Sequence, residues 1–476
     1  MPTKDPGQKA SAGLKQAVLR LAVVGHTNTG KTSLLRTLTR DPDFGDVRDS
    51  PGTTRHVEGA RLLVEGLTVV ELFDTPGMED GIALLDYLDQ LAQRSERLDG
   101  PDRIRRFLNS PESKRRFEQE ARVLHKLLDC DAALYVVDVR DPVLGKHKDE
   151  LAILASCGHP LLPVLNFTHS PEQRVESWRE ALARLGLHAM VEFDTVAPAL
   201  DGETQLYDKL ALLLDSHAHV LQTLKEDVSR QRDIRRSDAN RLIAELLVDV
   251  AAWHLSSEPD EPSLKRTTET LRTRVRAREQ QCVKALLKRY NFKVNDFSSQ
   301  ALPLEGERWG MDLFHPQALK DMGIRVTKGM AAGAMAGATV DVFMAGLSLG
   351  AAALIGAAAG GLWQGADGLG KRILGRLKGY QELSVDDAVL RLLALRQIAL
   401  VHALERRGHA AQAPINIDPG IDALRKGELP GEINEARSQP QWSTLADNHA
   451  PSPRREYVIQ ALAGELAQFT IDLEME

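Results

Sequence analysis

Cysteine is scarce in this chain of 476 residues. There are three, Cys130, Cys157 and Cys282, and they lie far apart with no Cys-x-x-Cys spacing. Three cysteines cannot all pair within one chain, and structural zinc sites draw on closely spaced cysteines, so the sequence favours neither a disulfide framework nor a zinc site. We expect buried or unreactive thiols in a reducing cytosol.

Aromatic residues and positive charge are also in short supply. Phe, Trp and Tyr together make up 5% of the residues, and the net charge at pH 7 is −7. Few aromatics argue against base stacking as the main function, and no overall basic field attracts nucleic acid or anionic lipid. Composition therefore gives no support to a nucleic-acid partner.

The N-terminal stretch lacks the apolar run of a secretion signal. Residues 1–16 are polar, with several Lys and Gly. We expect them to form a disordered lead-in, and we expect the protein to be cytoplasmic.

Short apolar runs alternate with helical patterns over residues 17–216. Strands are predicted at 17–24, 56–64, 67–74, 132–139, 161–166 and 189–195, and helices at 31–40, 147–158, 171–186 and 203–216. This alternation predicts an α/β domain with a mostly parallel sheet and helices on both of its faces.

A charged stretch of helical periodicity fills residues 80–130, with a break at Asp99-Gly-Pro101. It is too long for an ordinary connection, so we interpret it as an inserted helical pair. Two readings stay open: a plain solvated pair of helices, or a regulatory or dimer-forming insert that senses nucleotide state.

Strand patterns fade after residue 216. Helices are predicted at 217–256, 262–290, 382–408 and 454–474, so the C-terminal domain, 217–476, is expected to be all-α.

Residues 329–366 form a hydrophobic segment rich in Gly and Ala. Glycines recur every four residues, and the run Gly346-Leu-Ser-Leu-Gly350 indicates a turn between two helices. One reading is a hairpin that contacts or enters the inner membrane with both ends in the cytoplasm; the other is a glycine-zipper hairpin inside a soluble helical domain.

The clearest motif follows the first predicted strand. Gly25-His-Thr-Asn-Thr-Gly30-Lys31-Thr32 fits G-x-x-x-x-G-K-[ST], with a strand before it and a helix after it. Backbone N–H groups of such a loop wrap a phosphate, the lysine neutralises it, and the threonine hydroxyl binds Mg²⁺. The predicted nucleotide contacts are Gly25, His26, Thr27, Asn28, Thr29, Gly30, Lys31, Thr32 and Ser33.

Two further motifs follow in the order that a nucleotide switch requires. Thr54, or alternatively Thr53, precedes the second strand and is placed to reach Mg²⁺ when a γ-phosphate draws its loop inward. Asp74 ends the third strand in D-x-x-G, as a ligand of the metal or of one of its ligands, and Gly77 offers an amide to the γ-phosphate. Lys31, Thr54, Asp74 and Gly77 are thus the predicted catalytic residues.

The runs GHTNTGKTSL, SPGTTRH, FDTPG and VVDVRDP together resemble the TrmE–Era–EngA superfamily of bacterial GTPases over residues 17–216. The whole chain further resembles a bacterial family in which an Era-like G domain is fused to a C-terminal domain of unknown function. The resemblance implies a P-loop G domain that binds GTP and GDP and uses Mg²⁺. A homodimer through the G domains is an option.

The resemblance also bears on catalysis. Met78 follows Gly77 where Ras-type enzymes carry a water-positioning Gln. An apolar residue cannot polarise water, so catalysis must draw on another group. Asn28 matches the asparagine that helps to hold K⁺ in TrmE-like members; the alternative is a loop residue that tolerates tight geometry.

The base-recognition motif departs from the family. Asn166-Phe167-Thr168-His169 stands where N-K-x-D is expected. Asn166 is predicted to bond purine N7 and Phe167 to stack on the base, but the Asp that accepts from guanine N1–H and N2–H₂ is missing. The sequence therefore predicts a Mg²⁺-dependent GTPase switch with K⁺ stimulation as an option. The alternatives are an ATP-preferring P-loop NTPase and a membrane module gated by nucleotide; an RNA-linked role comes from the resemblance alone.

Overall fold

The computed structural model describes residues 18–41, 44, 58–91, 98–292, 304–305, 308–324, 347–349, 381–406 and 429–475. The expected lead-in at 1–16 lies outside the described residues. So do residues 329–346 and 350–366 of the glycine-rich segment. The chain divides into two compact units, Met1–Gln231 with Arg406–Ala411 and Arg232–Glu405 with Gln412–Glu476.

The first unit is built on a six-stranded sheet with strand order β2-β3-β1-β4-β5-β6. β2 and β3 pair antiparallel, and the other pairs of this sheet are parallel. The strands are β1 (Leu19–Val24), β2 (Glu58–Val64), β3 (Leu67–Asp74), β4 (Ala132–Asp138), β5 (Leu161–Asn166) and β6 (Val191–Glu192). The predicted mostly parallel sheet is confirmed.

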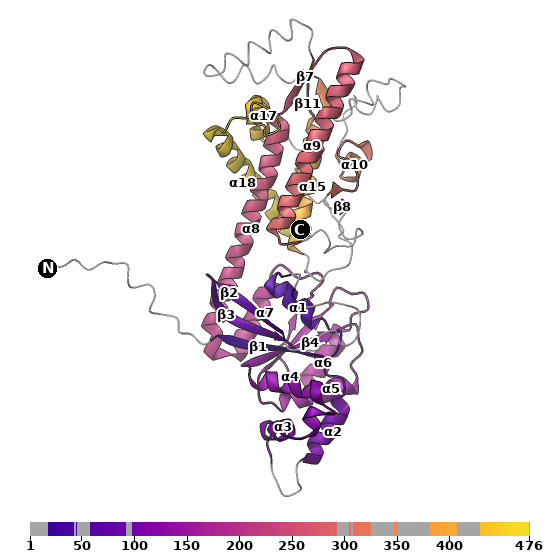
Figure 1. Cartoon of the computed structure of the whole chain (residues 1–476), viewed down its shortest axis with the longest axis vertical. Coiled ribbons are helices and arrows are strands. Elements are labelled where there is room, and N and C mark those ends of the chain that lie inside the picture. The colour runs from indigo at the N-terminus through magenta and orange to yellow at the C-terminus, as the bar shows by residue number, and fades with distance from the viewer. Residues whose placement is uncertain are drawn as a thin grey trace, which may run out of the picture. The chain divides into compact units, whose positions relative to one another are not determined.

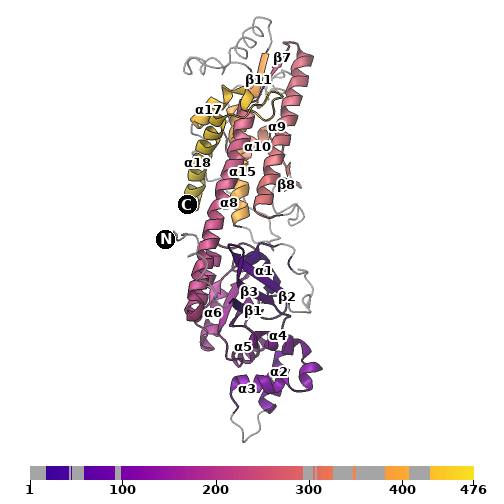
Figure 2. The same cartoon turned by 60° about the vertical axis from the view of Figure 1, so that its left-hand side comes forward.

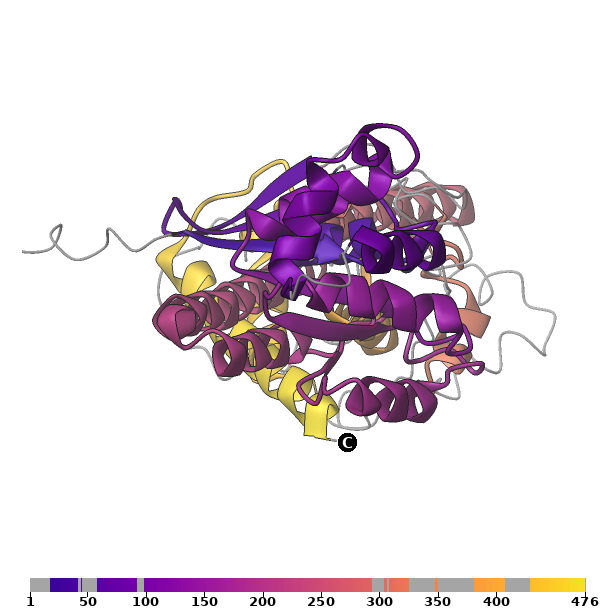
Figure 3. The same ribbon diagram turned by 90° about the horizontal axis from the view of Figure 1, so that it is seen from below.

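Helices cover both faces of this sheet (Figures 1 and 3). Their bounds are α1 (Lys31–Thr39), α2 (Gly81–Leu91), α3 (Gly100–Leu108), α4 (Glu118–Leu128), α5 (Gly145–Ala155), α6 (Val175–Arg184) and α7 (Gly202–Leu213), with short 3-10 turns η2 (Glu112–Lys114) and η3 (Asp215–His217). Alternate residues of β1 enter two separate cores: Leu21 and Val23 pack with α1 and α7, whereas Ala22 and Val24 pack with α2 to α6. Successive side chains of the strand thus point to opposite faces of the sheet, and each face has its own core and its own layer of helices.

The described residues of segment 80–130, namely 80–91 and 98–130, contain three α-helices, α2, α3 and α4, in place of the expected pair. The break at Asp99 is real: the Asp99 side chain accepts from Asp102 N and caps α3. A second break follows because Pro111 disfavours helical backbone at the residue before it, so α3 ends at Leu108 and cannot continue into α4.

The second unit is mainly helical, as expected. Its helices are most of α8 (Ala218–Ala252), α9 (Glu261–Arg289), α10 (Pro316–Asp321), α15 (Asp387–Glu405), α17 (Gly431–Arg437), the turn η5 (Pro440–Trp442) and α18 (Pro453–Met475). Helices α8, α9 and α15 run side by side around one large apolar core (Figure 2). The first turns of α8 belong to the first unit, where Leu221 and Leu224 join its core, so the units divide inside α8 rather than before it.

Strands correct the all-α expectation for this region. β7 (His254–Ser257), β10 (Leu347–Leu349) and β11 (Gln381–Val385) form an antiparallel sheet in the order β10-β11-β7, and β8 (Leu304–Glu305) pairs with β9 (Arg308–Trp309). In β11 burial alternates over the last four positions only, where Leu383 and Val385 are buried and Glu382 and Ser384 are half-buried. This short period merges in sequence with the leucine pattern of α15.

The turn expected at Gly346–Gly350 is also wrong, because Leu347–Leu349 is strand β10, paired with β11. Among the helices that the structure describes, none has the length and apolar character needed to cross a membrane.

Asp249 organises the packing of the second unit. Its buried carboxylate accepts from Arg278 Nε and Arg455 Nη2, both at 2.8 Å, and from Thr444 N at 3.1 Å and Thr444 Oγ1 at 2.7 Å. One side chain thus ties α8 to α9, to α18 and to the loop after η5.

We expect Asp249→Ala to destabilise the second unit by about 3–5 kcal/mol, because two largely buried guanidinium groups lose their counter-charge. Hydrogen exchange of α9 and α18 peptides at increasing urea measures the loss. Asp447→Ala is the control, since the Asp447 side chain is 98% exposed and pairs loosely with Arg274. Equal midpoints for the two variants would contradict the assignment.

Candidate nucleotide site

The carboxyl ends of the parallel strands meet at one edge of the first unit's sheet. Val24, Asp74, Asp138 and Asn166 are the last residues of β1, β3, β4 and β5. Ligands of open α/β sheets bind at this edge. The loop from β1 to α1 therefore begins at the edge where Asp74, Asp138 and Asn166 end their strands.

The backbone of this loop depends on glycine at both ends. Gly25 has φ 140° and Gly30 has φ 92°, and Asn28 also lies in the left-handed region at φ 65°. A Cβ on Gly25 would lie 2.5 Å from Val136 O, and one on Gly30 would lie 2.3 Å from Asn166 Nδ2. Tight approach to β4 and β5 thus requires these two residues.

The predicted loop contacts lie in one arc around the N-terminus of α1. Thr29 is buried, and its hydroxyl donates to His26 O at 3.0 Å; Ser33 is buried in α1, and Asn28 is exposed at the tip. Lys31 turns back into the loop, where Nζ donates to Gly25 O at 3.1 Å and to His26 O at 2.6 Å.

Lys31 is a buried cation. Burial lowers the pKa of its ammonium group, and the nearby carboxylates of Asp74 and Glu150 oppose that shift. The loop therefore encloses a positive charge together with the N-terminal end of α1.

Thr32 and Asp74 are brought together. Thr32 Oγ1, in the first turn of α1, donates to Asp74 Oδ2 at 2.5 Å, and Asp74 is fully buried at the end of β3. A hydroxyl and a carboxylate thus lie together near Lys31, and their contacts with Mg²⁺ stay predictions. Thr54 and its alternative Thr53 lie outside the described residues.

Gly77 touches the phosphate loop directly. A Cβ on Gly77 would lie 2.4 Å from Thr27 Oγ1 and 2.6 Å from Thr27 N, so no larger residue fits there. Within the described part of the chain, Thr27 Oγ1 is buried and has no hydrogen-bond partner. The Met78 side chain packs into the apolar core with 1% exposure.

Helix α4 holds the backbone that follows Asp74. Gln119 Nε2 donates to Gly77 O, and Glu120 Oε1 accepts from Glu79 N at 3.2 Å and Asp80 N at 3.1 Å. Sequence reasoning missed both residues. They lie some forty positions from their partners, and a Gln-Glu pair in a charged helix carries no local signal.

A cluster of titratable groups lies beneath the loop. His26 Nε2 is 2.9 Å from Lys146 Nζ, and burial together with the charge of Lys146 lowers the pKa of His26. Tyr135 donates to Glu150 Oε2 at 3.2 Å. Burial raises the pKa of Glu150 to about 7 despite the opposing charge of Lys31.

Asn166 joins the phosphate loop to two other loops. Its Nδ2 donates to Thr29 O at 3.0 Å, and its Oδ1 accepts from Phe167 N and Thr195 N, both at 2.9 Å. The side chain is fully buried. All of these contacts are to protein backbone, and the contact with purine N7 stays a prediction.

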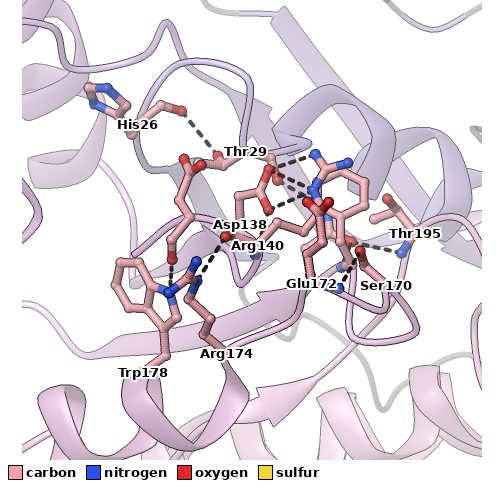
Figure 4. A network of polar contacts seen from close by, with 12 residues as sticks. His26, Thr29, Asp138, Arg140, Ser170, Glu172, Arg174, Trp178 and Thr195 are labelled. Atoms are coloured by element: carbon pink, nitrogen blue, oxygen red, sulfur yellow. Dashed lines mark hydrogen bonds and ion pairs between the residues drawn. The ribbon is translucent and has the colours of Figure 1, made fainter. Parts of the chain in front are cut away.

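Phe167 lies over the phosphate loop. It adopts φ 63°, and its Cζ is 3.4 Å from a Cβ built on Gly30. The Arg140 guanidinium stacks on the ring, 3.9 Å from the ring centre, and is fixed by a two-pronged pair with Asp138, at 2.9 Å from Nε to Oδ1 and 2.7 Å from Nη2 to Oδ2. Figure 4 shows this pair beside Thr29 and Thr195.

Two family models match the chain. Residues 20–167 match the model described as 50S ribosome-binding GTPase, and residues 179–464 match the model described as domain of unknown function DUF3482. The second match covers well over half of the chain, and it begins within α6, before the last strand of the sheet.

Among individual relatives, tRNA modification GTPase MnmE of a Picosynechococcus species is 41% identical over 80 residues, 17% of this chain and 16% of that protein. MnmE of a Synechococcus species is 32% identical over 170 residues, 35% of this chain and 28% of that protein. The chain thus spans less than a third of the length of these relatives. The crystal structure of Era in complex with MgGDPNP and 16S ribosomal RNA nucleotides gives a TM-score of 0.30 at 14% identity, covering 52% of this chain and 74% of that one.

The pKa of Glu150 makes stability depend on pH. Its pKa rises from 4.5 to about 7 on folding, so between these values the folded chain keeps a proton that the unfolded chain releases. Stability therefore falls as pH rises through this window.

We expect Glu150→Gln to be more stable than the parent at pH 8 by about 2 kcal/mol, with the difference shrinking toward pH 5. Urea unfolding at both pH values measures it, with Asp149→Asn, the half-buried neighbour, as control. A difference that does not change with pH would show that Glu150 ionises normally.

Proposed function

This chain belongs to the DUF3482 family and carries an N-terminal GTPase domain of the Era and MnmE type, and we propose that it acts as a Mg²⁺-dependent molecular switch. The GTPase domain makes the chain a GTP-hydrolysing enzyme. Binding of GTP and GDP follows from the domain; the roles of metal, switch and individual residues are our assignments.

The hydrogen bond from the Thr32 hydroxyl to the Asp74 carboxylate is the observation that supports the proposal best. It joins the first turn of α1 to the end of β3, beside the buried ammonium of Lys31. Hydroxyl and carboxylate oxygens are ligands that Mg²⁺ prefers, so this pair fits the ion. Mg²⁺, when bound, neutralises charge on the β- and γ-phosphates. Thr54 is proposed from sequence to complete the metal contacts in the GTP state.

The phosphate groups are assigned to the loop between Gly25 and Lys31. Loops of this sequence bind phosphate through their N–H groups, a lysine and the positive N-terminal end of the helix, which here is α1, beginning at Lys31. Thr27 Oγ1, buried and without a partner among the described residues, adds a polar group that a phosphate oxygen would satisfy.

Hydrolysis joins a water oxygen to the γ-phosphorus while the bond to the bridging oxygen breaks and GDP leaves with the electron pair. Met78 cannot orient that water, because its side chain is in the core. A second task is to stabilise the γ-phosphate oxygens, and we assign it to the Gly77 amide and the charge of Lys31.

The base is assigned to the loops after β5 and β6. The Phe167 ring, backed by Arg140, offers an aromatic face next to the phosphate loop. Asn166 holds Phe167 and Thr195 in place through its Oδ1, and we keep the proposal that its Nδ2 also bonds purine N7.

We expect Lys31→Ala to weaken binding of fluorescent GTP on the order of 100-fold, because a charge-assisted contact to phosphate is lost. Fluorescence titration measures the affinity. Lys148→Ala, an exposed lysine of α5 in the same unit, is expected to bind as the parent does. Unchanged binding by Lys31→Ala would refute a triphosphate in this loop.

We also propose that K⁺ stimulates hydrolysis through Asn28, whose exposed amide stands at the tip of the loop with φ 65°. Bound K⁺ would supply positive charge near the β- and γ-phosphates. Phosphate release should be faster in KCl than in NaCl, and Asn28→Ala should abolish the difference, whereas Asn109→Ala, an exposed asparagine after α3, should retain it. Equal turnover of the parent in both salts would refute this role.

A further inference from the structure

His169 and Asp194 form a pair at the base end of the site. His169 follows β5 and Asp194 follows β6, so the two loops leave neighbouring parallel strands on the same edge. Asp194 Oδ2 accepts from His169 N at 2.9 Å and lies 3.1 Å from His169 Nδ1. The His169 side chain is 66% exposed, whereas that of Asp194 is 3% exposed.

The Asp194 carboxylate cannot turn away from this contact. Its other oxygen, Oδ1, accepts from Val196 N at 2.9 Å and Ala197 N at 3.2 Å. Three backbone N–H groups, from both loops, therefore fix the orientation of the carboxylate. A buried acceptor that is fixed in this way also fixes the imidazole that touches it.

The contact selects one tautomer of His169. A carboxylate only accepts hydrogen bonds, so the ring nitrogen that faces it, Nδ1, must carry the hydrogen. In the neutral ring the second nitrogen, Nε2, then presents a lone pair. The exposed end of His169 is thus a hydrogen-bond acceptor, like the carboxylate that the motif lacks.

The base must lie close to this acceptor if a nucleotide binds in the phosphate loop. Asn166 ties the loop that carries His169 to Thr29 O, and Phe167 covers Gly30. Guanine presents N1–H and a 2-amino group as donors, whereas adenine has a lone pair at N1 and no 2-amino group. An acceptor at this place pairs with the first edge and repels the second.

We propose that His169, oriented by Asp194, accepts a hydrogen bond from the guanine edge and gives the site its preference for GTP over ATP. The inference rests on the proposed function, because it needs a nucleotide in the phosphate loop. His169 is the specificity-determining residue, and Asp194 is a positioning residue that acts through it.

The test compares dissociation constants of GTP, ITP and ATP for the full chain. The parent should prefer GTP. His169→Ala should reduce the ratio of GTP to ATP affinity about tenfold, the value of one hydrogen bond to a base edge, with ATP affinity unchanged or improved. Its side chain is exposed, so this variant is expected to fold. His169→Asp should restore the preference, because a carboxylate also accepts.

Asp194→Asn tests the tautomer, because an amide N–H that faces Nδ1 would move the ring hydrogen to Nε2 and turn an acceptor into a donor. GTP affinity should fall at least as far as in His169→Ala, and the double variant should equal His169→Ala. His188→Ala, an exposed histidine of the same unit, should leave the ratio unchanged.

The outcomes separate this inference from the proposed function. Loss of preference in His169→Ala with rescue by His169→Asp supports it. Nucleotide binding with an unchanged ratio in His169→Ala, or without any preference in the parent, overturns it and leaves the phosphate site standing. A parent chain that binds no triphosphate overturns both.

Discussion

The nucleotide site depends on one buried amide. Asn166 donates to Thr29 in the phosphate loop and accepts from Phe167 and Thr195 in the two loops beyond it. An amide has one donor end and one acceptor end, so it fits this arrangement in one orientation only. Leaving such backbone groups unpaired in the interior costs about 1–3 kcal/mol each. The loop after β1 and the loops after β5 and β6 are therefore held together, and Gly30 is glycine because the Asn166 amide occupies the space of a Cβ.

Much of the first unit can be read from the sequence because its signals are local. Strands Leu67–Asp74 and Leu161–Asn166 have the bounds that their apolar runs predict, and the loop after Val24 is set by glycines that tolerate positive φ. In the second unit the short strands His254–Ser257 and Gln381–Val385 adjoin long amphipathic helices. Four or five residues of period two are too few to stand out against such neighbours, so the sequence alone predicts continuous helix.

The site shows the same division between local and distant information. Lys31, Thr32 and Asp74 are recognisable because each lies in a short motif, Lys31 and Thr32 in the loop after Val24 and Asp74 in D-x-x-G. The hydrogen bond from the Gln119 side chain to Gly77 O joins residues that are 42 positions apart, and no residue pattern predicts it. When its motif is read by itself, His169 indicates only that the expected Asp is missing. Only the folded chain shows that Asp194, 25 positions away, contacts it.

Buried charge has different meanings in the two units. Burial raises the pKa of Glu279 to about 6, much as it raises that of Glu150 to about 7, so a displaced pKa alone does not mark a functional site. Glu279 meets Arg396, which also donates to Met311 O, and the pair joins packed elements of one core. Glu150 instead lies beneath a glycine-bounded loop, near the charge of Lys31. The ammonium group of Lys31 donates its hydrogen bonds to two backbone carbonyls of that loop. Burial itself therefore does not distinguish the candidate nucleotide site from the helical core. The distinction lies in the partners of the buried groups: an arginine for Glu279 in the core, and a loop lysine near Glu150 in the site.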